Sequence, residues 1–177
     1  MRRWIVTVAL GAAVLVAAGC GGDDGESATT QWAGGVCEAM ATWKEAVTDI
    51  GGTLASGGLS ADGLREAAGD VQAATETLVD DLEGLGRPDT DAGQQAEEVV
   101  TGLADELSSQ AETIEKTVEG ASGVSGTLQA VSAVTAALGT MGTEIGTAVT
   151  ELSQLDGAQE LEDAFKDADA CQELTSN

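Results

Sequence analysis

Apolar residues recur at steps of three and four along the chain from Trp32 onwards, and this spacing limits the fold more than any other feature. It places the apolar side chains on one stripe of a helix, whereas a strand would show strict alternation of apolar and polar residues. The first stripe runs from Trp32 to Ile50 and stops at Gly51-Gly52. We therefore predict a first helix that ends at this pair of glycines.

Two further stripes are bounded by residues that start or stop helices. Ser60 can cap a second helix, and Gly86-Arg87-Pro88 ends it because proline cannot continue the hydrogen-bond ladder. The third stripe runs from Ala96 to Val118 and stops at a Gly-Ala-Ser-Gly segment. We expect acidic residues in the first turn of this third helix, where the helix dipole favours them.

The fourth stripe runs from Leu128 through Val131 and Leu138 to Leu155. Beyond Gly157, the tail is either a kinked continuation of this helix or a short fifth helix. Apolar stripes of similar length, joined by short Gly-rich turns, can bury their faces most simply against one another. We predict an all-α fold, an antiparallel up-down four-helix bundle, with a short C-terminal fifth helix as one alternative for the tail.

The N-terminal segment has the plan of a signal peptide, with a basic start at Met1-Arg2-Arg3 and an apolar run from Trp4 to Val16. Small residues then lead to a cysteine in Ala17-Ala18-Gly19-Cys20, which resembles the lipobox of bacterial lipoproteins. We predict a signal peptide over residues 1–19 and lipid attachment at Cys20, with ordinary cleavage and release as the alternative. Residues 20–30 are expected to form a flexible acidic linker and residues 31–177 the bundle domain.

The two remaining cysteines are Cys37 and Cys171. Outside the reducing cytoplasm such a pair tends to be oxidised. In an up-down bundle the start of the first helix lies beside the end of the last, so both thiols belong at the same end of the bundle. We predict a Cys37–Cys171 disulfide, with two free, buried thiols as the alternative.

The charge balance excludes one class of partner. The chain carries 7 basic and 31 acidic residues, which gives a formal net charge of −24. Nucleic acid is excluded because its phosphates would have to be neutralised by clustered Lys and Arg. We interpret the acidity as a solvated surface.

The sequence contains no histidine, which excludes Ser/His/Asp and Cys/His nucleophiles and histidine-based metal sites. Asp80-Asp81 and Glu97-Glu98 would point to different sides of a helix, so we do not expect an acid/base pair there. The segment Asp89-Thr90-Asp91-Ala92-Gly93 is faintly similar to a calcium loop, but it lacks the closing Glu and is better explained as a capped helix start. We expect no catalytic residue, no metal and no cofactor.

Gly142 and Gly146 form a G-x-x-x-G motif within a stretch that has no charge from Gly120 to Thr143. Three interpretations are open. The motif could insert into a membrane, pack closely within the bundle, or leave a ligand groove between helices. Close packing is favoured because polar residues interrupt the apolar run, and because seams rich in Ala and Gly leave little room for a cavity.

Three segments follow the lipobox and the acidic linker: Trp32-Ala33-Gly34-Gly35-Val36-Cys37, Ala41-Thr42-Trp43-Lys44 and the stretch from Phe165 to Cys171. With the lipobox, their order resembles uncharacterised small helical lipoproteins of high-GC Gram-positive (actinobacterial) bacteria. The resemblance implies a cellular location and a fold but carries no activity. We expect a non-catalytic lipoprotein, anchored by lipid to the extracytoplasmic face of the cytoplasmic membrane, that contacts an envelope protein or acts as a spacer. The alternative is a carrier of a small apolar ligand or lipid.

Overall fold

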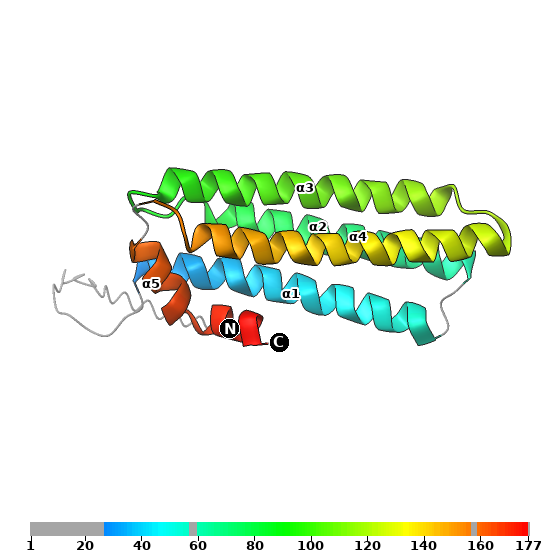
Figure 1. Cartoon of the computed structure of the whole chain (residues 1–177), viewed down its shortest axis with the longest axis horizontal. Coiled ribbons are helices and arrows are strands. Elements are labelled where there is room, and N and C mark those ends of the chain that lie inside the picture. Colours follow the sequence, from blue (N-terminus) through cyan, green and yellow to red (C-terminus); the bar gives the residue numbers. More distant parts are fainter. Residues whose placement is uncertain (1–26, 57–59, 157–158, 177) are drawn as a thin grey trace, which may run out of the picture.

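The computed structural model describes residues 27–56, 60–156 and 159–176, and within these ranges all regular structure is helical. Consecutive long helices run in opposite directions, so the all-α, up-down arrangement predicted from the stripes is confirmed (Figure 1). The tail forms two short helices rather than one. The helices are α1 (Ala28–Ser56), α2 (Ala61–Leu85), α3 (Gly93–Glu119), α4 (Gly123–Leu152), α5 (Gln159–Asp167) and α6 (Asp169–Ser176).

Helix α1 is longer than predicted at both ends. It begins at Ala28, inside the expected linker, where the Ser27 hydroxyl accepts a hydrogen bond of 3.0 Å from the Thr30 backbone N–H. It also continues through Gly51-Gly52, so the predicted end at this pair was wrong. Each glycine costs a helix about 1 kcal/mol. The buried side chain of Leu54 extends the apolar stripe by another turn and offsets that cost.

The next two helices start in different ways. Ser60 caps α2 as predicted, because its hydroxyl accepts a hydrogen bond of 3.0 Å from the Gly63 N–H. Helix α3 lacks the acidic first turn that we expected, and its N-cap residue Ala92 makes no side-chain bond. Gly93 starts it instead, packed so closely against the Pro88 carbonyl oxygen that a Cβ atom would overlap with that oxygen. Close backbone packing, rather than a polar cap, defines this start.

The buried face of α4 differs from the predicted stripe. Leu128 is 56% exposed, Val131 and Leu138 are half-buried, and the smaller Ala130 and Val134 face the core. The predicted stripe followed the spacing of the large apolar residues alone. In the structure α4 packs mainly on α3 and touches α1 only sparsely, so its buried face is narrower.

The C-terminal helices take the place beside α1 that α4 leaves open. Both α5 and α6 pack against α1, and α5 lies across the end of the bundle where α1 begins (Figure 1). Phe165 of α5 meets Trp32 of α1 edge to face, with ring centroids 6.1 Å apart. The Trp32 indole N–H also donates a hydrogen bond of 2.9 Å to the Gly86 carbonyl oxygen. One tryptophan thus joins α1, α5 and the end of α2.

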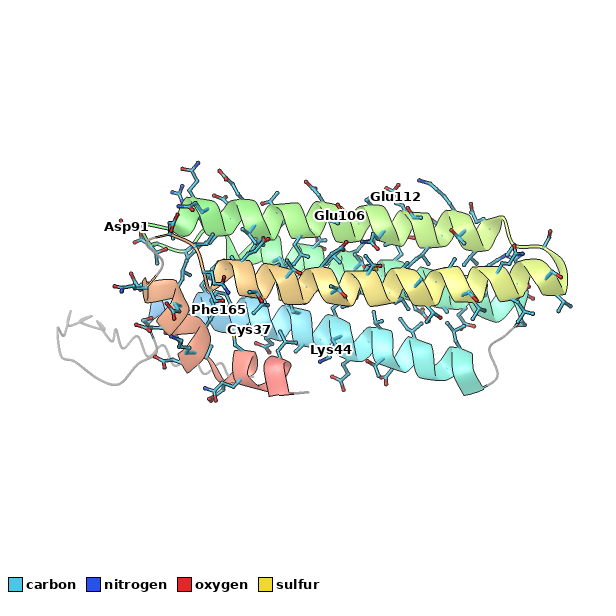
Figure 2. All side chains as sticks on the ribbon, in the orientation of Figure 1. Cys37, Lys44, Asp91, Glu106, Glu112 and Phe165 are labelled. Atoms are coloured by element: carbon cyan, nitrogen blue, oxygen red, sulfur yellow. A yellow bond between two sulfur atoms is a disulfide. The ribbon has the colours of Figure 1, made fainter. Side chains whose placement is uncertain are left out.

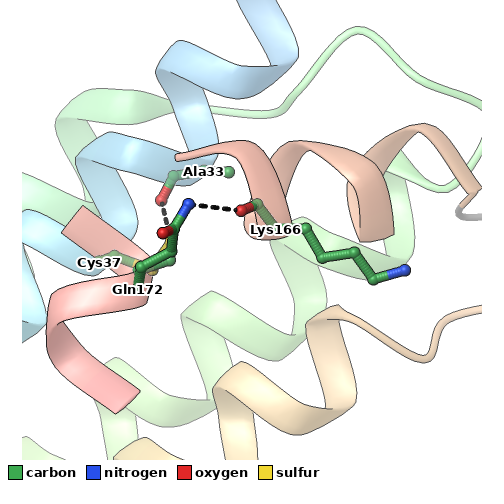
Figure 3. Close-up of a disulfide and its surroundings, with 5 residues drawn as sticks. Ala33, Cys37, Lys166 and Gln172 are labelled. Carbon is green, nitrogen blue, oxygen red and sulfur yellow. Dashed lines mark hydrogen bonds between the residues drawn. A yellow bond between two sulfur atoms is a disulfide. The ribbon is translucent and has the colours of Figure 1, made fainter. Parts of the chain in front are cut away.

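A disulfide joins Cys37 of α1 to Cys171 of α6, in agreement with the prediction (Figure 3). Their Cα atoms are 5.0 Å apart and both residues are buried. Next to the bridge, the Gln172 side-chain amide donates a hydrogen bond of 2.9 Å to the Lys166 carbonyl oxygen, which ties α6 to the end of α5. The predicted lipid site Cys20 and the signal peptide lie outside the described residues.

Candidate functional site

Helix α4 has an open groove on each side, and the two grooves have different chemistry. The groove on the α1 side, which we call the Lys44 groove, has a volume of about 370 Å³. Its walls come from the middle of α1, the second half of α4 and the last turns of α6. The lining residues are Trp43, Lys44, Gly142, Ile145, Gly146, Val149, Thr150 and Leu174.

Hydrogen bonds and the disulfide hold two walls of the Lys44 groove in place. The Trp43 indole N–H donates a hydrogen bond of 3.2 Å to the Thr75 hydroxyl, which in turn donates one of 2.8 Å to the Val71 carbonyl oxygen. On the opposite wall, Leu174 lies three residues after Cys171, so the disulfide positions it. The groove therefore depends on contacts that lie deep in the core and at the bridge.

The glycines of the G-x-x-x-G motif line this groove and make no close helix contact. A Cβ atom placed on Gly142 or Gly146 would meet nothing within 4 Å, and both residues are exposed. The favoured prediction of close packing at this motif was therefore wrong. Their missing side chains leave space in the α4 wall, as the groove interpretation requires. Separately, none of the described helices has the length and apolar character that a membrane crossing requires.

Among the residues whose side chains the structure describes, Lys44 is the only charged one that lines this groove. Its side chain is exposed and forms no ion pair with any other described residue (Figure 2). By contrast, Arg65, Lys116 and Lys166 each pair with an acidic residue of their own helix. A second hollow, of about 460 Å³, shares Val149 with the Lys44 groove and reaches towards Phe165 and Cys171.

The groove on the α3 side of α4, which we call the acidic groove, has a volume of about 470 Å³. Its lining includes Glu98, Glu106, Glu144 and Glu151 and, among the described residues, no basic side chain. Burial raises the pKa of Glu144, the nearby Glu106 raises it further, and a hydrogen bond from Gln110 lowers it. The Gln110 amide lies 2.6 Å from each oxygen of the Glu144 carboxylate.

The acidic pairs singled out in the sequence lie on solvated faces. Asp80-Asp81 and Glu97-Glu98 are exposed, as are Asp89 and Asp91 of the segment that is similar to a calcium loop. Among the described residues, no group of three or more acidic or cysteine side chains could hold a metal ion.

The sequence analysis missed Lys44 as a site residue, although the sequence carries a signal for it. Arg65, Lys116 and Lys166 each have an acidic residue three or four positions away on their own helix, where a helical ion pair can form. Lys44 has none. Among the basic residues of the described helices, it is the one whose own helix offers no partner at that spacing.

Comparison with protein families, with curated proteins and with solved structures found no match for this chain.

Proposed function

We propose that this protein is a non-catalytic, lipid-anchored module of the cell envelope, held at the extracytoplasmic face of the cytoplasmic membrane through Cys20. The observation that carries the proposal is the leader, in which small residues directly before Cys20 follow a basic start and an apolar run. Two or more acyl chains anchor a protein stably, because each buried methylene contributes about 0.8 kcal/mol. Such an anchor needs no basic patch and is compatible with a net charge of −24.

The start of α1 supports a short tether. Seven residues lie between Cys20 and Ala28, so the eight steps of this linker could span at most about 26 Å at roughly 3.3 Å per residue. The 30 residues of α4 have a helical rise of about 45 Å, which sets the height of the module if its long axis points away from the membrane. A partner protein in the envelope would then be met within about 70 Å of the bilayer.

The lack of histidine and the solvated position of the described acidic pairs support a role without catalysis. Contact with an envelope protein, or spacing of such proteins from the membrane, is the role that we propose. A carrier function for an apolar ligand is the second candidate, and the Lys44 groove is the observation that favours it.

Metabolic labelling with a fatty-acid analogue tests the anchor. The wild-type chain should carry label and sediment with membranes, and Cys20→Ser should lose both properties. Cys37→Ser is the matched control, because it removes a cysteine outside the lipobox and should keep its label. A Cys20→Ser protein that still carries label would contradict the proposal.

A further inference from the structure

We propose that the Lys44 groove binds one medium-chain fatty acid, with its hydrocarbon chain along α4 and its carboxylate at Lys44. This inference does not depend on the lipid anchor. It rests on the shape of the groove, on the apolar residues of its walls and on the position of Lys44, which forms no ion pair with another described residue.

The walls of the groove suit a hydrocarbon chain. Trp43, Ile145, Val149 and Leu174 present apolar side chains from three helices, and Gly146 leaves the space beside them unfilled. Small-molecule pockets have volumes of about 300 to 1,000 Å³, and this groove, at about 370 Å³, lies at the lower end of that range.

The same volume argues against a helix of a partner protein as the occupant. A helix is about 10 Å across with its side chains, so roughly one turn of it would fill 370 Å³. A single turn offers too little buried area for a stable complex. A single acyl chain is thinner and can bury more of its surface in the same space.

The positive charge of Lys44 in the groove favours a ligand with an anionic head group. Among the described side chains, the groove lining contains Lys44 and no carboxylate, in a chain with 31 acidic residues. Because salt screens exposed charges beyond about 8 Å, the nearby ammonium group acts on a bound head more strongly than distant carboxylates do. A compact carboxylate can approach Lys44 while the acyl chain follows the apolar wall. The acidic groove on the other side of α4, lined by four glutamates, would repel the same ligand.

Tryptophan quenching by a brominated ligand tests the proposal directly, because Trp43 lines the groove. The full chain with Cys20→Ser, in its oxidised form, is titrated with 12-bromododecanoate below its micelle concentration. We expect saturable quenching that disappears in Trp43→Phe. We also expect 12-bromododecanol, which has the same chain and a neutral head, to bind about threefold to fivefold more weakly, the effect of one exposed charge pair.

Matched variants distinguish binding of the ligand's hydrocarbon chain from recognition of its carboxylate. Gly146→Leu should fill the groove and abolish quenching by both ligands, whereas Gly139→Leu makes the same change one heptad earlier, outside the groove, and should leave binding unchanged. Lys44→Gln should remove the preference for the acid, and Lys116→Gln on α3 should keep it. If Gly146→Leu does not fold by circular dichroism, Gly142→Leu replaces it, because its new side chain also enters open space.

Three results would overturn the proposal. The first is quenching that does not saturate, which is also expected if the groove serves an apolar partner segment. The second is binding that persists in the folded Gly146→Leu and Gly142→Leu proteins. The third is equal affinity for acid and alcohol.

Discussion

The two sides of α4 differ in how they are closed and in what they carry. On the α3 side, two long helices pack along their length, and the open surface above their seam is lined with glutamates. On the α1 side, the long helices touch only sparsely, and a short helix held by a disulfide completes the wall. Within one bundle, continuous helix packing leaves a charged surface groove, while incomplete packing leaves an apolar groove with one cation.

This difference indicates that the Lys44 groove depends on α6 and the acidic groove does not. Leu174 of α6 lines the first groove, and the second is formed by α3 and α4 alone. Changes near the disulfide should therefore affect the Lys44 groove, on the α1 side of α4. Changes at the start of α3 should affect the α3 side.

Removing the disulfide should have the largest effect. The bridge closes a loop with a sequence separation of 134 residues, which the chain-entropy model equates with about 5 kcal/mol. We expect reduction, or the Cys37→Ser/Cys171→Ser double variant, to lower the free energy of unfolding in urea by up to about that amount. Hydrogen exchange should accelerate in α6 more than in α3. A reductant that leaves the unfolding midpoint unchanged would contradict the prediction, and the double variant, which has no bridge, is the control.

Gly93→Ala should disturb the α3 side. The new Cβ atom would overlap the Pro88 carbonyl oxygen, which is backbone and cannot move aside as a flexible side chain can. We expect a loss of about 2 to 3 kcal/mol in the free energy of unfolding, typical of overpacking. Gly102→Ala is the control on the same helix, because its Cβ meets nothing within 4 Å and the change should stabilise α3 by up to about 1 kcal/mol. Equal effects of the two substitutions would refute the steric argument.

Thr75→Val tests the support of the Lys44 groove at the Trp43 wall. The change removes the hydroxyl that accepts the Trp43 indole N–H and leaves this buried donor without a partner. We expect a loss of about 1 to 2 kcal/mol in urea unfolding and a shift in the Trp43 emission. Thr77→Val is the matched control, since the exposed Thr77 hydroxyl donates only to the Ala73 carbonyl oxygen of its own helix. The prediction fails if both variants lose the same stability.

The smallest effect is expected at Glu144, in the acidic groove. Because its pKa is raised in the folded protein, Glu144 holds its proton more tightly when folded. Its contribution to stability is therefore fully present below the unfolded pKa and is lost as pH rises through the folded pKa. Glu106→Gln should lower the Glu144 pKa partly, since burial is the larger cause, and Gln110→Leu should raise it.

A carboxyl NMR titration measures the Glu144 pKa in each variant. Glu97→Gln is the control, because Glu97 lies on α3 as Glu106 does. A Glu144 pKa that does not respond to Glu106→Gln would show that the two carboxylates do not interact. Neither Glu106→Gln nor Gln110→Leu should affect the Lys44 groove, because α4 lies between that groove and the acidic groove.

The elements predictable from the sequence are those governed by local rules. The Ser60 cap, the end of α2 before Pro88 and the first three stripes follow from residue types at fixed spacings, and the Cys37–Cys171 bridge follows from cysteine number and up-down topology. The end of α1 was mispredicted because burial of Leu54 outweighs the cost of two glycines, and such burial depends on tertiary packing.

The groove was less predictable for a similar reason. Gly142 and Gly146 are compatible with close packing or with open space, and the outcome depends on how far α1 diverges from α4. Leu128 faces solvent for the same reason, because α4 contacts α1 only sparsely. The lack of an ion-pair partner for Lys44 on its own helix was available from spacing alone, but its place beside Trp43 and Leu174 required the position of α6.

One measurement tests the contrast between the two sides of α4 most directly. In a methyl-resolved NMR spectrum of the oxidised Cys20→Ser chain, dodecanoate is added below its micelle concentration. We predict saturable shifts at Ile145, Val149 and Leu174 of the Lys44 groove, and none at Val99 and Leu103, which line the acidic groove. Equal shifts in both groups, or shifts at Val99 and Leu103 alone, would contradict the account.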